Sequence, residues 1–257
     1  MPLIRLDKFL ASAEICSRSE CRKILKAARV TVNGIPAGDP SQKIDPDVSK
    51  VLLDGEMVNY SRFRYYMLNK PAGYITANED RLQATVMDLL PEKRRKNLSP
   101  VGRLDKDTEG LLIITDDGVT AHRLLSPKAH VPKTYLVCAD GPLSEDDCVL
   151  FREGVDIGEE ALTAPARLRI LGADIKKIPE DVICYLPENV PACEIPFWAL
   201  VTITEGKFHQ VKRMFNAVGR DVLYLKRISM GTVVLDPDLS SGEWRFLTEE
   251  EISSITC

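Results

Sequence analysis

The chain has 257 residues, of which 44% are hydrophobic and 28% are charged. This length accommodates two domains with separate cores, and the composition is that of a folded globular protein rather than a disordered chain. No apolar run approaches the roughly 18 residues of a membrane span, and Arg5, Asp7 and Lys8 interrupt any signal-peptide core. We therefore expect a cytoplasmic protein with no membrane partner.

Cysteine and histidine are too scattered to indicate a metal site. The seven cysteines include no C-x-x-C pair, and the chain has three histidines. A zinc site would need an unusual ligand set drawn from distant segments. We expect no metal, and cysteines that are reduced and structural.

The net charge of −4 argues mildly against a nucleic-acid partner, unless the basic residues are gathered in one region. The first 30 residues carry seven basic side chains and three acidic ones. Acidic residues are concentrated later in the chain, as in 249–251. The N-terminal region is therefore the part of the chain that could meet RNA.

Residues 1–60 have the pattern of two short helices and a small sheet. Helical spacing runs from Leu6 to Ala13, and a capping box over 17–20 opens a second helix. The strand 30–32 runs into an Asn-Gly hairpin turn, and 50–53 returns as a strand. One exposed stripe of the second helix is basic, through Arg18, Arg22, Lys26 and Arg29. Such a stripe is either a solvated face or an RNA contact.

After a brief linker over 61–64, a second domain begins with a strand that Pro71 and Gly73 stop. The pattern then predicts further helices at 85–90 (capped by Thr85), 119–125, 144–154 (capped by Ser144), 211–218 and from Glu249 onward (capped by Thr248). It predicts strands at 111–114, 133–137, 164–171, 198–204 and twice within 221–236. The stretch 173–197, rich in Pro and Glu, is either an extended hairpin or a lid. The basic run 93–96 is either a solvated surface or a flank of an RNA path.

Residues 99–110 form a charged loop that leads into the buried strand 111–114. Its acidic residues match the spacing of an EF-hand calcium loop, with ligands at Asp105, Asp107, Glu109 and Asp116. An EF-hand loop lies between two helices, whereas Pro100 and Gly102 interrupt an entering helix here and a strand follows. We therefore reject calcium and place Asp105 on a braced loop at a sheet edge.

The segment 205–219 reads as an amphipathic helix. Val211, Met214, Phe215 and Val218 have the i, i+3, i+4, i+7 spacing of a core face, and Gly219 ends the helix. A neighbouring polar stripe has the same spacing, through His209, Lys212, Arg213 and Asn216. Such a stripe is the normal outer face of an amphipathic helix.

Four segments together resemble the RsuA/RluB type of RNA pseudouridine synthase. They are Gly102-Arg103-Leu104-Asp105 followed by Thr108 and Gly110, then 69–73 (Asn-Lys-Pro-x-Gly), 133–135 (Lys-x-Tyr) and the run 206–214. Residues from about 3 to 60 closely resemble an S4 domain, a small RNA-binding module. The resemblance implies an α+β protein with a small S4 domain (1–60), a linker (61–64) and a catalytic domain (65–257) built on a mixed, mainly antiparallel sheet flanked by helices.

The resemblance also implies roles for individual residues. Asp105 would be the catalytic carboxylate, Lys212 its cationic partner and Tyr135 the ring presented to the target base, although strand tyrosines are most often core residues. Substrate binding would fall to Arg103, Leu104, Asn69, Lys70, His209, Gln210 and Arg213. RNA docking by the S4 domain would use Arg5, Lys8, Arg18, Arg22, Lys26 and Arg29. The reaction needs no cofactor.

Over almost its full length the chain most resembles the synthases that act on a single uridine of small-subunit (16S) ribosomal RNA, usually uridine 516. The large-subunit (23S) synthases of the RluB, RluE and RluF kind are the nearest alternative. A non-catalytic RNA-binding assembly factor of the same fold is a second alternative. We expect a monomer that binds ribosomal RNA, within a precursor ribonucleoprotein particle.

Overall fold

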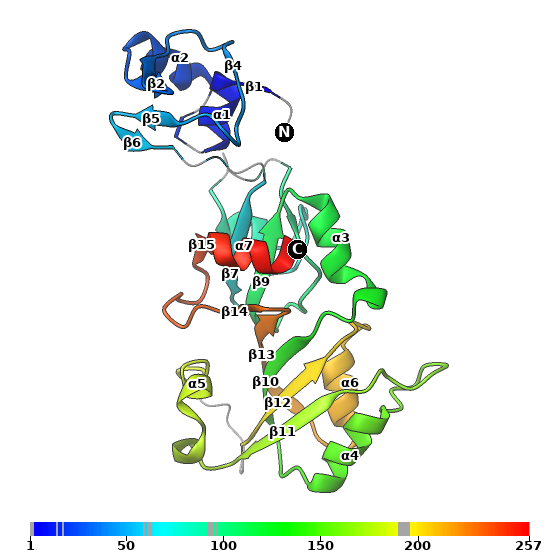
Figure 1. Ribbon diagram of the computed structural model, residues 1–257. Coiled ribbons are helices and arrows are strands. Elements are labelled where there is room, and N and C mark those ends of the chain that lie inside the picture. Colours follow the sequence, from blue (N-terminus) through cyan, green and yellow to red (C-terminus); the bar gives the residue numbers. More distant parts are fainter. Residues whose placement is uncertain are drawn as a thin grey trace. The chain divides into compact units, whose positions relative to one another are not determined.

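The computed structural model describes residues 3–13, 15, 16, 18–58, 60, 63–91, 95, 97–189 and 196–256, with Arg18 by its backbone alone. The chain divides into two compact units, Met1–Arg64 and Tyr65–Cys257 (Figure 1). Several positions singled out in the sequence lie outside the described residues: Ser17, Lys93, Arg94, Lys96, Cys193, Cys257 and the side chain of Arg18.

The first unit packs two helices on short strands, as its sequence predicts. The helices are α1 (Leu6–Ser12) and α2 (Arg18–Lys26). The strands are β1 (Ile4–Arg5) paired with β4 (Lys43–Ile44), and a four-stranded sheet in the order β3 (Ile35–Pro36), β2 (Val30–Val32), β5 (Val51–Leu53), β6 (Glu56–Met57). Positive φ angles at Asn33 and Gly34 confirm the tight hairpin turn. The core contains Leu6, Phe9, Leu10, Leu25, Val30 and Val51.

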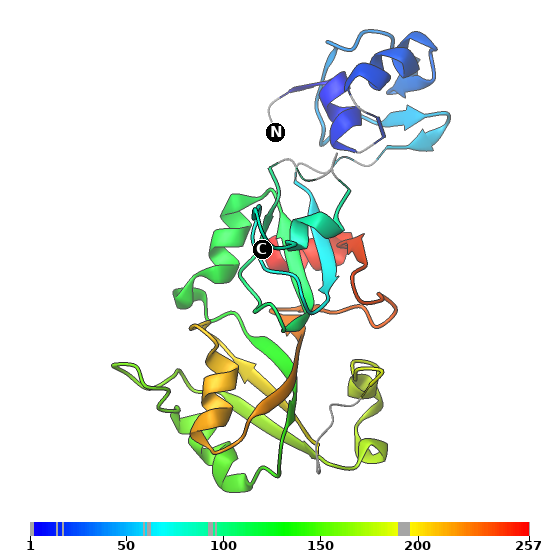
Figure 2. The same cartoon turned by 180° about the vertical axis from the view of Figure 1, so that it is seen from behind.

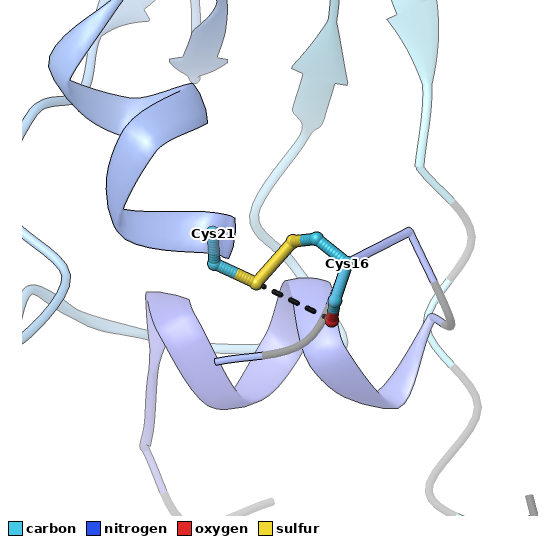
Figure 3. The surroundings of a disulfide bond; sticks show 2 residues. All are labelled: Cys16 and Cys21. Carbon is cyan, nitrogen blue, oxygen red and sulfur yellow. Dashed lines mark hydrogen bonds between the residues drawn. A yellow bond between two sulfur atoms is a disulfide. The ribbon is translucent and has the colours of Figure 1, made fainter. Parts of the chain in front are cut away.

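Cys16 and Cys21 form a disulfide in this unit (Figure 3). The expectation that the cysteines are reduced is therefore wrong for this pair, whereas Cys138, Cys148 and Cys184 are free. Cys16 precedes α2 and Cys21 lies near its start, which brings their Cα atoms to 5.4 Å, within the range of disulfides. A search for C-x-x-C spacing misses this pair because the approach depends on how the chain enters the helix.

The described part of the second unit is organised on a nine-stranded sheet. Its main order is β11 (Arg167–Gly172), β12 (Phe197–Ile203), β10 (Lys133–Ala139), β13 (Val222–Met230), β9 (Glu109–Thr115), β7 (Tyr65–Lys70), β15 (Trp244–Phe246), with β14 (Val233–Val234) beside β13 and β8 (Ser99–Pro100) beside β9. Neighbours along it are antiparallel except β9 and β13, which are parallel. The fold is therefore the expected α+β class on a mixed, mainly antiparallel sheet.

Helical segments flank this sheet: η1 (Val86–Leu89), α3 (Gly118–Leu125), η3 (Pro127–Ala129), α4 (Glu145–Glu153), η4 (Ile175–Lys177), α5 (Glu180–Ile183), α6 (Gln210–Ala217) and α7 (Glu249–Thr256). α4 and α6 pack on the face that carries Val137 and Val201, and lie side by side at the β11–β12 end (Figures 1 and 2). The predicted capping box of α4 is present between Ser144 and Asp147. Every helix within the described ranges is too short or too polar to cross a bilayer.

The stretch 173–197, for which the sequence leaves an extended hairpin and a lid as alternatives, is not an extended hairpin in its described residues. Its described residues form η4 and α5 instead. Ile178 and Val182 are buried, and the Tyr185 hydroxyl donates to the Leu235 carbonyl at 2.7 Å. These contacts anchor the segment to the body of the unit, because buried apolar and hydrogen-bonded groups resist local opening.

A buried ammonium group ties β7 to the loop that precedes β9. Lys70 ends β7 and is 0% exposed, and its Nζ donates to the carbonyls of Thr108 at 2.7 Å, Pro71 at 3.0 Å and Lys106 at 3.3 Å. Burial lowers the pKa of Lys70 to about 8, although nearby carboxylates, that of Glu109 foremost, oppose this shift. Lys70 therefore fixes the backbone that follows Asp105.

β9 and β13 approach each other so closely that one position must be glycine. Gly110 has a φ of +97°, and a Cβ there would lie 2.3 Å from the Arg227 carbonyl oxygen and 2.8 Å from the Lys226 Cγ. The backbone oxygen cannot move away without breaking the parallel pairing of Lys226 with Glu109 and of Arg227 with Gly110. The glycine after the acidic loop thus sets where the loop meets the sheet.

We predict that Gly110→Ala lowers the free energy of unfolding of the second unit by roughly 3 kcal/mol, from backbone strain and overpacking together. Gly158→Ala is the matched control, because Gly158 also has positive φ (+75°) but has nothing within 4 Å of an added Cβ. The control should lose about 1 kcal/mol. Urea unfolding is followed through Trp198 and Trp244, the chain's two tryptophans, which both lie in this unit. Equal losses would contradict the close approach of β9 and β13.

We predict that Lys70→Met lowers the free energy of unfolding by about 3 kcal/mol at neutral pH, because three carbonyls lose a charged donor. Between about pH 8 and 10.5 the unfolded wild-type chain holds the Lys70 proton more tightly than the folded one, so this group's contribution to stability rises with pH. The deficit of Lys70→Met should therefore grow from pH 8 to pH 10.

The control is Lys106→Met, since Lys106 is exposed and its Nζ donates to the Gln83 side chain. Its effect should stay within about 0.5 kcal/mol, as for most surface substitutions. A deficit of Lys70→Met that is constant from pH 8 to pH 10 would show that the lysine is not held with a lowered pKa.

Candidate active site

The backbone on both sides of Asp105 is held by hydrogen bonds. The Leu104 amide donates to the Thr76 hydroxyl at 3.1 Å, and that hydroxyl donates to the Leu104 carbonyl at 2.8 Å. After Asp105, the Thr108 amide donates to the Asp105 carbonyl at 3.1 Å, and Lys70 holds the carbonyls of Lys106 and Thr108. The Asp105 carboxylate therefore projects from a fixed turn, with its side chain 27% exposed.

The start of α6 is shaped by the buried side chain of Gln210. Its Oε1 accepts from the Lys207 amide at 2.9 Å, and its Nε2 donates to the Glu205 carboxylate at 2.7 Å. His209 takes a left-handed conformation (φ +47°) just before the helix begins. This arrangement aims His209 and Lys212, one turn later, toward the Asp105 loop.

Two side chains from the α6 segment meet Asp105. The Lys212 Nζ lies 3.4 Å from the Asp105 Oδ2, and the His209 Nε2 lies 3.5 Å from the Asp105 Oδ1. Lys212 is closer to Asp107, with its Nζ 2.6 Å from Oδ1 and 2.8 Å from Oδ2. Lys212 is thus shared between two carboxylates rather than paired with Asp105 alone.

Asp107 differs from Asp105 in its surroundings. Its side chain is 72% exposed, against 27% for Asp105. Desolvation would raise the pKa of Asp107, but the hydrogen bond and the charge of Lys212 outweigh it, so this pKa lies below its ordinary value. Asp107 therefore stays ionised at neutral pH and holds one side of the Lys212 ammonium.

Asp105 borders a cleft of about 670 Å³. Small-molecule sites have volumes of roughly 300–1,000 Å³, so this one admits a single nucleotide. Tyr135, on β10, is 7% exposed and lines the cleft, and Arg103 is exposed on its border. Phe208 is 75% exposed and stacks on His209 with ring centroids 3.8 Å apart. Other lining residues are Thr76, Leu104, Lys133, Ile203, Gln210, Val211, Lys212, Leu225 and Arg227.

Three residues expected to bind substrate do not line the cleft. Arg213 donates to the carboxylate of Glu159 at 2.7 Å and to the carbonyls of Phe208 and Ile157. Asn69 donates to the Leu239 carbonyl at 2.7 Å, and Lys70 is the buried brace described above. The polar side chains predicted to share one face of α6 therefore do not all contact the cleft, because His209 and Lys212 reach the Asp105 loop whereas Arg213 reaches Glu159.

The basic residues expected on the S4 domain fall into two groups. Arg5 pairs with Asp7, and the guanidinium of Arg29 pairs with the carboxylate of Asp54. Lys8, Arg22 and Lys26 are exposed and make no ion pair with any described residue. Those three are free to meet phosphates.

Sequence reasoning missed three residues of the site. Thr76 gives no signal, because a single threonine in a loop is ordinary. Phe208 lies inside a recognised segment but was not singled out as an aromatic at the cleft border. Arg227, on β13, was assigned only to a strand, although a basic residue within an apolar strand is itself a sign of a buried charge with a specific role.

In the described ranges, no three His, Cys, Asp or Glu side chains are grouped so as to hold a metal ion. The loop with EF-hand spacing runs directly into β9, as its sequence predicts. The cleft instead offers the carboxylates of Asp105 and Glu205, several cations and aromatic rings.

Comparison with known proteins identifies the family. The model of the RNA pseudouridylate synthase family matches residues 64–217, and that of the S4 domain matches residues 4–48. RNA pseudouridine synthase YtzG of Bacillus subtilis is 48% identical over 250 residues, which cover 97% of each chain. Ribosomal small subunit pseudouridine synthase A of Escherichia coli K12 is 39% identical over 254 residues, covering 98% of this chain and 100% of the relative.

Among solved structures, one described as a pseudouridylate synthase is 36% identical and covers 98% of this chain and 100% of its own, with a TM-score of 0.64. The residues matched by the synthase model include the turn of Asp105, the strand of Tyr135 and the helix of Lys212. The chain belongs to the RNA pseudouridine synthase family, and it carries an N-terminal S4 domain.

Proposed function

We propose that this enzyme converts one uridine of 16S ribosomal RNA to pseudouridine, at uridine 516, with Asp105 as the reacting carboxylate. One observation carries the proposal: the Asp105 carboxylate borders a nucleotide-sized cleft and lies within 3.5 Å of both the Lys212 ammonium and the His209 imidazole. The turn that holds Asp105 is fixed by buried hydrogen bonds, as a catalytic group requires.

The reaction breaks the bond from ribose C1′ to uracil N1 and forms a bond from C1′ to C5. C5 loses a proton and N1 gains one, so no redox partner is needed. A carboxylate can serve this exchange as nucleophile or as base. The Lys212 ammonium lies 3.4 Å from that carboxylate and attracts it, which helps to hold it at the border of the cleft.

Tyr135 is suited to hold the base while it is detached. Its ring lines the cleft and its strand neighbours fix it on the sheet, opposite Val201 on one side and Arg227 on the other. A uridine in folded RNA must be turned out of its stack to reach this position, at a cost of a few kcal/mol. Arg103 lies on the border of the cleft, where it can contact the displaced backbone.

Support for 16S rRNA comes from the names of relatives, since several at about 40% identity are called ribosomal small subunit pseudouridine synthase A. In this proposal residues 1–60 dock on folded RNA through Lys8, Arg22 and Lys26, and residues 65–257 carry out the reaction. A-form RNA hides its major groove, so docking relies on phosphate and shape. The enzyme acts as a monomer on a precursor particle.

We predict that Asp105→Asn lowers the single-turnover rate by more than about 10³-fold, while its affinity for RNA stays within threefold of the wild type. Asp107→Asn is the matched control, because it makes the same change two residues away on an exposed side chain. It should lower the rate by less than about tenfold, through a weaker hold on Lys212. Near-normal turnover by Asp105→Asn would remove Asp105 from the mechanism.

The substrate is tested with 16S and 23S transcripts labelled with tritium at uridine C5, and with precursor small-subunit particles. Turnover releases the C5 tritium to water, and the modified position is then mapped on each RNA. We expect release from 16S rRNA at uridine 516 and none from 23S rRNA. Modification of 23S rRNA alone would overturn the substrate, and binding without release from any RNA would indicate an assembly factor.

A further inference from the structure

Arg227 is a buried cation that lines the cleft. It lies on β13 and is 2% exposed. The strand register places it directly opposite Tyr135 on β10, so the two side chains share one face of the sheet as cross-strand neighbours. A positive charge therefore lies on the sheet beside the ring proposed to hold the base.

The guanidinium of Arg227 is incompletely bonded. Its Nε donates to the Leu111 carbonyl at 2.8 Å, but its Nη2 is buried without an acceptor among the described residues. No carboxylate of the described chain forms an ion pair with it. Buried donors are normally satisfied, and charged ones above all. Within the described residues, Nη2 of this cleft-lining arginine therefore lacks an acceptor.

A second cation stands close to the first. Lys133 is 8% exposed, lines the same cleft and donates to the Val131 carbonyl at 2.9 Å. Its pKa is lowered by burial and, after that, by the positive charge of Arg227. Two buried cations without a carboxylate partner favour an occupant that carries negative charge during the reaction.

We propose that Arg227 binds the substrate base, donating from Nη2 to a carbonyl oxygen of the uracil held against Tyr135, with Lys133 adding positive charge. This inference rests on the proposed function. When the bond between C1′ and N1 breaks, its electron pair stays on the base, and the charge spreads from N1 to the carbonyl oxygens. A guanidinium fixed in a buried site stabilises that anion more than the neutral base, which lowers the barrier.

The burial of Arg227 favours the base over a phosphate as its partner. Phosphates of a turned-out nucleotide stay near the solvent, where Arg103 is exposed on the cleft border. Nη2 is buried, so an acceptor for it has to come from within the cleft that Arg227 lines and not from a phosphate at the solvent.

The test combines a protein change with an atomic change in the RNA. The substrate is a 16S fragment containing the mapped uridine, or the same fragment with 2-thiouridine or 4-thiouridine there, since sulfur is a weaker acceptor than oxygen. Arg227→Gln should lower the single-turnover rate on the normal fragment by roughly 10²-fold, with the dissociation constant changed less than threefold. One of the two thio substitutions, at the oxygen that Arg227 contacts, should slow the wild-type enzyme. The same substitution should slow Arg227→Gln little further, because the protein change and the RNA change remove the same contact.

Controls separate a direct contact from a structural effect. Arg169→Gln removes an exposed arginine from β11, away from the cleft, and should react at the wild-type rate. Where Arg227→Gln does not fold by tryptophan fluorescence, Arg227→Lys takes its place, since it keeps the charge but not the fork of donors.

Three outcomes would overturn the inference. The first is a wild-type rate in Arg227→Gln. The second is a combined rate loss, at both sulfur positions, equal to the product of the loss from Arg227→Gln and the loss from the thio substitution. The third is a loss of RNA affinity alone with a smaller salt dependence, which would indicate a phosphate contact. A wild-type enzyme that modifies no ribosomal RNA would instead overturn the proposed function, so the two failures are distinguishable.

Discussion

The site depends on the irregular turn that carries Asp105, whose backbone is held by hydrogen bonds from buried side chains. The Lys70 ammonium donates to the Lys106 and Thr108 carbonyls after Asp105 and to the carbonyl of its own neighbour Pro71. The Thr76 hydroxyl forms two hydrogen bonds with Leu104. An irregular loop would otherwise sample many conformations, each with a different position for the Asp105 carboxylate. Burying one ammonium costs solvation free energy, which the carbonyl dipoles and the nearby carboxylates offset only in part, because burial still lowers the pKa of Lys70. The position of the Asp105 carboxylate is therefore set before any substrate arrives.

The sharing of Lys212 follows from that fixed turn. Asp105 and Asp107 lie two residues apart and both reach the same ammonium, but their exposures differ, at 27% and 72%. A contact with an exposed carboxylate is weakened by water and salt, whereas one at a cleft strengthens when a bound nucleotide excludes water. An occupant that excludes water from the cleft would therefore strengthen the attraction of Lys212 to Asp105. The exposed partner keeps the ammonium in place while the cleft is empty.

Local signals in the sequence predicted most of the fold, because they report local physics. The Asn33-Gly34 turn, the capping box at Ser144 and the apolar stripe of α6 depend on residues within one or two turns of each other. The strand after the acidic loop followed from its apolar run and its flanking glycine.

Features that depend on distant segments were not predictable in the same way. Arg213 lies on the same predicted polar stripe as Lys212, yet it binds Glu159 and does not line the cleft. The contact of Thr76 with Leu104 joins residues 28 positions apart, and Arg227 meets Tyr135 only through the order of strands in the sheet. The positions of Asp105, Lys212 and Tyr135 at one cleft were expected from family resemblance, not from periodicity or spacing.

The net negative charge of the chain does not conflict with an RNA substrate, because an RNA interacts mainly with the charges near its binding site. Charges more than about 8–10 Å apart across solvent are largely screened at physiological salt, so the net charge of −4 says little about the cleft. The cleft is lined by Arg103, Lys133, Lys212 and Arg227, while one of its carboxylates, Glu205, is engaged with Gln210 and the Ala164 amide. Of these cations, Lys133 and Arg227 are buried and form no ion pair with a described carboxylate, so they make the empty cleft less stable than neutral residues would. An occupant carrying negative charge would relieve this repulsion, so the same two side chains that destabilise the empty cleft would favour such an occupant over a neutral one.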